Sequence, residues 1–266
     1  MRHQRALLAT LTATVTTLAL TACGSDDAAT SDAGEDLGLV SDGTLTVATE
    51  GTYRPFTFHD DSGELVGYDV EVAEAVADEL GLEIEFAETQ WDAIFAGLDA
   101  GRFDTIANQV SITPEREEKY AFSEPYTVSR GVVVVPAGDT SVSSFADLDG
   151  KTSAQSLTSN WRTLAEESGA AVEPVEGWAQ AVALLEQGRV QTTINDSLTV
   201  LDYLQEHPDA PIEIAAETED TSESAFAVTP QREALATAID GALDTLAADG
   251  TLTELSQKYF GEDVSR

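Results

Sequence analysis

From residue 44 onward, apolar and polar positions follow two different periods along the chain. Leu45 and Val47 alternate with threonines, and Ile84 and Phe86 alternate with acidic residues. This is the period of a β-strand with one face more buried than the other. The run Gly131–Val135 is continuously apolar, which is typical of a strand that is buried on both faces.

Segments with helical spacing lie between these strands and after them. Val72, Val76 and Leu80 share one face of a predicted helix. Asp69 can cap the start of this helix, and Gly81 follows its end. The same spacing recurs twice near the end of the chain, at 235–246 and 251–260. Strands and helices that alternate in this way predict open α/β sheets.

An internal repeat indicates two lobes of similar build. The stretch Trp91–Asn108 (WDAIFAGLDAGRFDTIAN) aligns without gaps with Trp178–Asn195 (WAQAVALLEQGRVQTTIN). Each copy predicts a helix that is ended by glycine and followed by a short strand. In open α/β sheets, ligands bind beside the carboxyl ends of the strands. The ends of the two copies, 108–111 and 195–197, are therefore expected to face a shared cleft.

The amino-terminal segment has the features of an export signal. Two arginines precede an apolar run, 6–20, which is too short to span a bilayer and is typical of a signal-peptide core. The run ends in LTACG, which resembles the lipobox of bacterial lipoproteins. We therefore expect removal of residues 1–22 and a lipid on Cys23, the single cysteine, which would place the protein on the outer face of the cell membrane. A free thiol in a buried apolar segment is the alternative.

The composition is strongly acidic, with 49 Asp and Glu against 13 Lys and Arg. Such a surface repels nucleic acid and anionic lipid, so we expect no nucleic-acid partner. We interpret the acidic residues as a solvated coat, and an acidic binding face is the alternative. Residues 23–42 are small and acidic and are expected to form a flexible tether. No Cys/His cluster indicates a metal and no paired nucleophile and base is visible, so we expect neither a cofactor nor catalysis.

Six segments of the chain carry a family resemblance. They are GTYRPFTF, GYDVEVA, WDAIFAGL, GRFDTIANQVSITPEREEKYAFSEPY, GRVQTTINDS and DGTLTELSQKYFGEDVS. Together they resemble the polar amino acid substrate-binding proteins of ABC importers, which are extracellular solute-binding proteins of family 3. The resemblance implies an α/β fold of the two-lobed, type II periplasmic-binding-protein kind, in which each lobe is an open, mostly parallel sheet flanked by helices. It implies lobe 1 at 43–130 and 224–266, and lobe 2 at 131–223.

The resemblance also implies a mode of action. A monomeric receptor would bind a free amino acid between its lobes, close around it, and deliver it to the permease of an ABC transporter. Two crossing segments, at 127–131 and 223–228, would absorb the hinge rotation.

The same resemblance assigns the two charged ends of the amino acid to opposite lobes. Arg116 stands at the place of the family's carboxylate-binding arginine, and its planar guanidinium suits paired bonds to a carboxylate. Asp196 matches the acid that holds the α-ammonium group. Ser111 and the backbone at Gln109 would complete this end of the site. On the residues alone, Arg116 could instead bridge a neighbouring glutamate on the surface, and Asp196 could cap a helix.

Further residues are expected around the rest of the ligand. Tyr53 and Trp91 occupy positions where the family places stacking rings, although both could be core aromatics. The stretch SLTSNW matches a family loop at a helix start, where the amides of Thr158, Ser159 and Asn160 can meet a carboxylate. This loop departs from the glycine-threonine form that is common in the family.

The identity of the ligand is indicated by three stretches. AQSLTSNW, TINDSLTVLDYL and YFGEDVS are most similar to binders of cystine or cysteine. Glu50 occupies the place where basic amino acid binders keep an acid, so an arginine or lysine binder is the alternative; cystine, with its second ammonium, is compatible with Glu50 as well. Trp178 is expected to remain in the core. Two alternatives of other classes are a dehydratase-like enzyme on the same fold and a surface lipoprotein that binds another protein.

Overall fold

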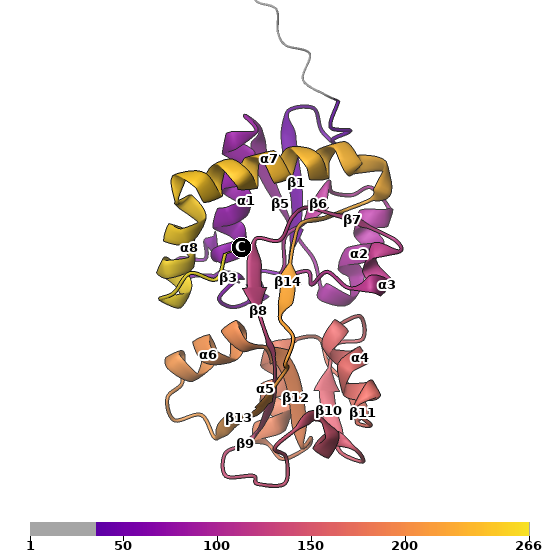
Figure 1. Ribbon diagram of the computed structural model, residues 1–266, viewed down its shortest axis with the longest axis vertical. Helices are drawn as coiled ribbons and strands as arrows, with labels where there is room; N and C mark the ends of the chain where they lie inside the picture. Colours follow the sequence, from indigo (N-terminus) through magenta and orange to yellow (C-terminus); the bar gives the residue numbers. More distant parts are fainter. Residues whose placement is uncertain (1–35, 266) are drawn as a thin grey trace, which may run out of the picture. The chain divides into compact units, whose positions relative to one another are not determined.

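The computed structural model describes residues 36–265, which form two lobes joined by two crossing strands (Figure 1). The predicted signal peptide, the predicted lipid site at Cys23 and the first part of the predicted tether lie outside the described residues. Within 36–265, no helix combines the length and the apolar character that crossing a membrane requires.

Lobe 1 is built on a five-stranded sheet with the strand order β5-β1-β6-β15-β7. β1 pairs in parallel with β5 and β6, whereas β15 runs antiparallel to β6 and β7. A separate antiparallel sheet has the order β2-β3-β4. The strands are β1 (Thr44–Thr49), β2 (Thr52–Tyr53), β3 (Thr57–His59), β4 (Leu65–Val66), β5 (Glu83–Glu88), β6 (Thr105–Ile106), β7 (Ala121–Phe122) and β15 (Ala227–Val228).

The helices of lobe 1 are α1 (Tyr68–Glu79), α2 (Trp91–Asp99), α3 (Pro114–Glu117), α7 (Glu233–Asp249) and α8 (Thr251–Phe260), with a 3-10 turn, η2, at Pro230–Arg232. Apolar faces of α1, α7 and α8 pack with β1 around a core that contains the fully buried Tyr68, Tyr126 and Phe226. The helix predicted after Asp69 is present, but the capping role of Asp69 was wrong. Gly67 occupies the N-cap position, and the Asp69 carboxylate turns to Gln109 instead.

Lobe 2 repeats this plan with the strand order β11-β10-β12-β9-β13. Its strands are β9 (Gly131–Pro136), β10 (Thr152–Gln155), β11 (Ala171–Pro174), β12 (Thr192–Asp196) and β13 (Ile212–Glu217), and its helices are α4 (Asn160–Glu167), α5 (Trp178–Glu186) and α6 (Ser197–Glu206), with a 3-10 turn, η1, at Phe145–Leu148. β9 runs antiparallel to β12 and β13, while β10 is parallel to β11 and β12. Each large sheet therefore has one reversed strand among parallel ones. The predicted fully buried strand is β9, in which Val132–Val135 are buried.

The sequence repeat corresponds to a structural repeat. α2 and β6 form the first copy, and α5 and β12 form the second. Gly101 and Gly188 follow the two helices with φ angles of 66° and 68°, in the left-handed region that favours glycine. The expected helix, glycine and strand are thus confirmed in both copies.

Two antiparallel strands carry the chain between the lobes. β8 (Thr127–Ser129) pairs with β14 (Ser222–Ser224), so that Thr127 lies opposite Ser224 and Ser129 opposite Ser222. Figure 1 shows these strands side by side between the two large sheets. We propose the lobe boundaries and the hinge segments at the positions that the sequence analysis gave.

The segment 36–40 lies against lobe 1, although the predicted tether includes it. Leu37 and Leu39 pack against the core of that lobe. The Val40 N–H donates to Asp104 Oδ1 at 2.7 Å, and Arg232 Nε donates to the Gly38 carbonyl at 2.8 Å. The prediction of a flexible tether from the acidic composition overlooked these two apolar side chains, which pack against the core.

Gly67 provides a test of this architecture. Its φ is 137°, and a Cβ there would overlap the Phe56 carbonyl and lie 2.8 Å from Thr57 N. We expect Gly67→Ala to lower the free energy of unfolding by clearly more than the ~1–2 kcal/mol that a left-handed conformation alone costs. Gly63→Ala is the control, because Gly63 has a φ of 84° and open space around its Cα. Urea unfolding would compare the two variants, and equal losses would contradict the steric account.

Candidate functional site

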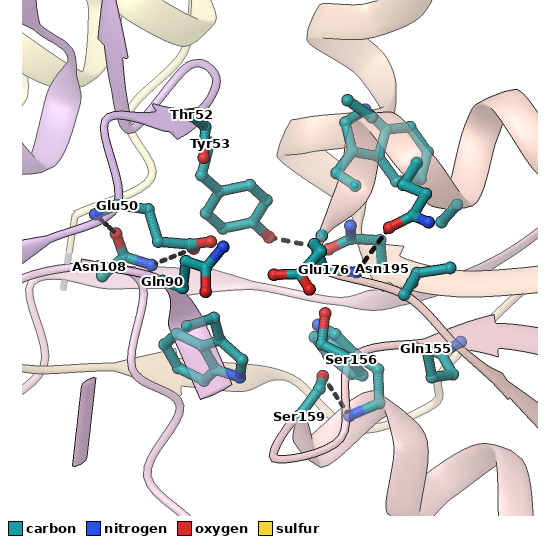
Figure 2. A pocket seen from close by; sticks show the side chains of 18 of the residues that line it. Glu50, Thr52, Tyr53, Gln90, Asn108, Gln155, Ser156, Ser159, Glu176 and Asn195 are labelled. Atoms are coloured by element: carbon teal, nitrogen blue, oxygen red, sulfur yellow. Dashed lines mark hydrogen bonds between the residues drawn. The ribbon is translucent and has the colours of Figure 1, made fainter. Parts of the chain in front are cut away.

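A cavity of about 480 Å³ lies between the two lobes. Lobe 1 lines it with residues that follow β1, β5 and β6, and lobe 2 lines it with residues at or just after the ends of β10, β11 and β12. Ligand sites in open α/β sheets lie at this edge of the strands. Figure 2 shows polar side chains from both lobes that converge on the cavity, which makes it the candidate site.

The structure brings only some of the predicted binding residues to this cavity. Those that line it are Glu50, Tyr53, Trp91, Gln109, Ser159 and Asn160. Those that do not line it are Ser111, Arg116, Thr158 and Asp196. Arg116 and Thr158 line a neighbouring cavity of about 400 Å³, which shares Ser159 and Asn160 with the larger one. Ser111 lines a third cavity, of about 650 Å³, which shares Asn160 and Trp161 with the cavity between the lobes.

Glu50 follows β1 directly and is held in place by Asn108. Asn108 Nδ2 donates to Glu50 Oε2 at 2.7 Å, and the Glu50 N–H donates to Asn108 Oδ1 at 2.8 Å. Burial raises the pKa of Glu50 to about 7, Asn108 opposes this shift, and the nearby Asp92 adds to it. The carboxylate therefore forms a proton-sensitive acidic group on the wall of the cavity.

Tyr53 and Trp91 supply aromatic surface from lobe 1. The Tyr53 hydroxyl reaches toward lobe 2 and donates to Asn195 Oδ1 at 2.7 Å (Figure 2). Burial raises the pKa of Tyr53 well above its ordinary value. Trp91 begins α2 and meets Phe95 edge to face, with ring centroids 5.5 Å apart. Both rings contact core side chains and the cavity at once, so neither belongs to the core alone.

Arg116 is buried at the edge of lobe 1, where α3 positions it. Thr113 caps this helix through its side chain, and Pro114 is its first residue. Arg116 Nη1 donates to the Ser111 carbonyl at 2.8 Å, and Nη2 lies 3.4 Å from the Thr158 carbonyl of lobe 2. The guanidinium carbon lies 5.4 Å from the centroid of the Trp91 ring.

Arg116 does not form the surface salt bridge that was the alternative to a binding role. Among the described residues, no carboxylate lies within ion-pairing distance of the guanidinium. Burial lowers the pKa of Arg116 to about 10, because the charged form has lost water. Arg116 is therefore a buried cation whose hydrogen bonds go to backbone carbonyls.

Asp196 ends β12 and caps α6. Its Oδ1 accepts from the Leu198 N–H at 2.9 Å, and its Oδ2 accepts from the Ser129 hydroxyl of β8. Burial raises the pKa of Asp196 to about 6. The helix-cap alternative thus describes the observed contacts, and a role toward a ligand ammonium stays a proposal.

In the loop before α4, the amide and hydroxyl groups have other hydrogen-bond partners than the ligand carboxylate that was predicted. The Thr158 N–H and hydroxyl both donate to Asp92 Oδ1 at 2.9 Å, and the Leu157 N–H lies 3.3 Å from Asp92 Oδ2. The Ser159 hydroxyl caps α4 by accepting from the Trp161 N–H. The predicted anion-binding amide of Thr158 is therefore occupied by a carboxylate of lobe 1.

Two further predicted residues face inward to the hinge. The Ser111 hydroxyl lies 3.1 Å from that of Ser222, beside β14. The Gln109 N–H, which belongs to the backbone expected to meet the ligand, donates to Asp69 at 2.6 Å.

Several residues that line the cavity were not assigned to ligand binding in the sequence analysis. Asn108 and Asn195 stand at equivalent ends of the internal repeat, which were expected to face the cleft, and both line the cavity. Trp178 was left in the core, where it does pack, but it also lines the cavity. Glu176 lines the cavity from lobe 2 without a sequence pattern that marks it.

Direct contacts between the lobes give the described protein a closed arrangement. Asp92 bonds to the loop at 157–158, Tyr53 bonds to Asn195, and Arg54 lies 3.6 Å from both Asp202 and Glu206. These contacts join residues of lobe 1 to residues of lobe 2.

With this geometry in view, comparison with known proteins defines the family. The sequence profile of the bacterial extracellular solute-binding proteins, family 3, matches residues 45–262. The chain belongs to this family. This solute-binding protein is 51% identical to a probable amino-acid ABC transporter-binding protein of Haemophilus influenzae, over 84% of this chain and 87% of the other. It is 48% identical to the L-cystine-binding protein TcyA of Bacillus subtilis, over 99% of this chain and the whole of the other.

Solved structures place the solute-binding protein among two-lobed type II proteins and inform its conformation. An ancestral arginine-binding protein bound to arginine is 34% identical with a TM-score of 0.77, covering 82% of this chain and 99% of the other. The L-cystine solute receptor of Neisseria gonorrhoeae, in its unliganded open conformation, is 47% identical with a TM-score of 0.58, covering 84% and 95%. The higher identity accompanies the lower TM-score, so sequence divergence does not account for the difference. That receptor is in an open conformation, whereas direct hydrogen bonds join the two lobes of this protein.

Asp92 offers a test of what holds the lobes together. Asp92→Ala removes three hydrogen bonds to lobe 2, each worth ~0.5–1.5 kcal/mol. We expect the ratio of open to closed molecules to rise by at least about tenfold, and the radius of gyration of the ligand-free protein to increase in small-angle scattering. Asp99→Ala is the control, because Asp99 lies on the same helix and bonds to Tyr120 within lobe 1. Identical scattering from the Asp92 variant and the wild type would show that these hydrogen bonds do not hold the lobes together.

The raised pKa of Glu50 predicts a dependence of stability on pH. Between its ordinary value of 4.5 and its folded value of about 7, the folded state binds more protons than the unfolded state. The contribution of Glu50 to the free energy of unfolding therefore falls as pH rises through this window.

Glu50→Gln removes this contribution. Relative to the wild type, we expect the variant to gain on the order of 2–3 kcal/mol between pH 4.5 and pH 8 in urea unfolding. Taking the difference between the two proteins cancels the titration of Asp69 and Asp196. Glu85→Gln, an exposed change on β5, should leave the pH profile unaltered. Parallel profiles for Glu50→Gln and the wild type would disprove the assignment.

Proposed function

We propose that this amino acid-binding protein of ABC transporters binds L-cystine in the cavity between its lobes. The observation that carries the proposal is the 48% identity to the L-cystine-binding protein TcyA, which extends over 99% of this chain. The L-cystine solute receptor of Neisseria gonorrhoeae, at 47% identity, supports it independently.

Two buried charges near the cavity, on residues that do not line it, favour a zwitterion as ligand. Among the described residues, no carboxylate forms an ion pair with the buried cation Arg116, and the buried anion Asp196 accepts hydrogen bonds from neutral donors. Unneutralised buried charges are costly. An α-carboxylate at Arg116 and an α-ammonium at Asp196 would neutralise both. The bond from Arg116 to the Thr158 carbonyl, at 3.4 Å, is long and weak enough to be replaced by a charge-assisted pair.

The polar residues that line the cavity can bind the second half of cystine. Cystine carries a second ammonium, for which Glu50 supplies a carboxylate, and a second carboxylate, for which the Gln90 and Asn160 side-chain amides supply donors. Tyr53 and Trp91 would flank the disulfide between the two halves. A cavity of about 480 Å³ lies within the usual range of ~300–1,000 Å³ for small-molecule sites.

A basic amino acid is the second candidate, and Glu50 is the observation that favours it. The ancestral arginine-binding protein bound to arginine, at 34% identity, shares the fold with this chain. An arginine or lysine side chain would place its cation beside Glu50. The lower identity to that protein than to TcyA makes cystine the preferred ligand.

We also propose the cellular setting of this activity. After cleavage of residues 1–22, a lipid on Cys23 would hold the protein at the outer face of the cell membrane, where the closed monomer would deliver its ligand to an ABC permease. We propose no catalytic role. One neighbour of 30% identity is an ancestral precursor of cyclohexadienyl dehydratase, yet it too is described as an amino acid-binding protein.

Thermal unfolding of the protein without residues 1–23, in the presence of each proteinogenic amino acid and cystine, tests the proposal. A ligand at a hundredfold its dissociation constant adds about 2.7 kcal/mol of stability, so we expect a clear shift with cystine. A response to arginine or lysine with none to cystine would favour the basic amino acid candidate. A response to no amino acid would reject both and leave binding of another protein.

The same assay tests Arg116. Arg116→Lys keeps a positive charge but loses the fork that pairs with a carboxylate, so we expect at least tenfold weaker binding of the responding amino acid in calorimetry. Arg189→Lys, an exposed change on lobe 2, is the matched control. Unaltered affinity after Arg116→Lys would remove Arg116 from the site.

A further inference from the structure

Gln109 has an unusual backbone conformation at the edge of the cavity. Its φ is 49°, and no other non-glycine residue among 36–265 has a positive φ. A side chain with a Cβ disfavours this left-handed region, so other contacts must impose the conformation. Gln109 follows β6 by three residues and lines the cavity. Unusual backbone geometry therefore coincides with the ligand-facing edge of lobe 1.

Asp69 bonds to both the backbone and the side chain of Gln109. Its Oδ2 accepts from the Gln109 N–H at 2.6 Å, and its Oδ1 accepts from Gln109 Nε2 at 2.7 Å. Asp69 is fully buried in the first turn of α1, where the helix dipole favours a negative charge. The carboxylate, which is held on helix α1, thus bonds to both the backbone and the side chain of Gln109. We call this pair of hydrogen bonds the grip.

The same grip extends to the crossing strand β8. Gln109 Nε2 also lies 3.1 Å from Thr127 Oγ1, in the first residue of that strand. The Gln109 side chain is thereby turned toward Asp69 and Thr127. Because the Gln109 N–H is bonded to Asp69, the carbonyl is the backbone group of Gln109 that is left for a ligand in the cavity.

An aspartate is required for this arrangement. Asparagine has the same shape but a single acceptor oxygen, so its amide group would oppose one of the two Gln109 donors. Among the described residues, no Lys or Arg forms an ion pair with Asp69, so Gln109 supplies donors that the buried carboxylate needs.

We propose that Asp69 is a positioning residue for amino acid binding, which holds Gln109 in the left-handed conformation and so presents the Gln109 backbone to the ligand. Asp69 does not itself line the cavity. The inference rests on the proposed function for the nature of the ligand, and on the geometry of Asp69 and Gln109 alone for the grip.

Affinity for L-cystine, measured by calorimetry in a set of variants, tests the proposal. Asp69→Asn should weaken binding at least tenfold, while Asp78→Asn, an exposed change on the same helix, should leave it unaltered. Gln109→Gly and Gln109→Ala both delete the side chain, but glycine adopts the left-handed conformation freely. The glycine variant should therefore bind at least fivefold more tightly than the alanine variant.

The double variant separates positioning from a merely structural role. In the Gln109→Gly background, Asp69→Asn should weaken binding less than threefold, because the backbone no longer needs to be held. A loss of tenfold in both backgrounds would overturn the proposal. If Asp69→Asn fails to fold, as judged by circular dichroism, the glycine and alanine variants decide the matter, and equal affinities for those two would overturn it.

A ligand-free readout keeps this test apart from the identity of the ligand. Hydrogen exchange at the Gln109 amide should be faster in Asp69→Asn than in Asp78→Asn, and unchanged protection would refute the grip. If the wild type binds arginine rather than cystine, the proposed ligand is wrong, and the same affinity series with arginine then tests Asp69.

Discussion

The structure depends on two buried carboxylates of opposite lobes, Asp196, which bonds to the short strand β8 directly, and Asp69, which is linked to β8 through Gln109. Thr127 and Ser129 are two residues apart on β8, so their side chains lie on the same face of the strand. Thr127 contacts Gln109, which Asp69 holds, and Ser129 donates to Asp196. Burial raises the pKa of both acids to about 6, because the charged form loses water and no Lys or Arg among the described residues forms an ion pair with either acid. The demand of these two groups for hydrogen-bond donors fixes the backbone at the point where the lobes join.

The buried cation of the region is Arg116, which lies among aromatic rings and backbone carbonyl groups. Arg116 lines a neighbouring cavity, which shares Ser159 and Asn160 with the cavity between the lobes. In the proposed binding mode, a ligand carboxylate at Arg116 and a ligand ammonium at Asp196 would neutralise two buried charges, which a neutral molecule of the same size would leave unpaired.

Much of the architecture was visible in the sequence because it depends on local periods. The alternation at Leu45 and Val47, the apolar run that became β9, and the repeated helix and strand all follow from contacts within short segments. The cavity edge followed from the same elements, since residues after β1, β6 and β12 meet at the carboxyl ends of the strands. The partners of the polar groups were not visible. Asp69 joins Gln109 across 40 residues, and Asp92 joins Thr158 across 66, so each pairing depends on how the helices and lobes are packed rather than on any local pattern. Leu37 and Leu39 were missed for a related reason, because the average composition of an acidic stretch hides single apolar residues.

The fastening of residues 38–40 onto Asp104 and Arg232 gives the two lobes unequal mechanical roles. With the proposed anchor at Cys23, a pull on the amino-terminal segment would be transmitted to lobe 1 through these contacts. Lobe 1 would then be the held half, and lobe 2 the half that rotates about the proposed hinge.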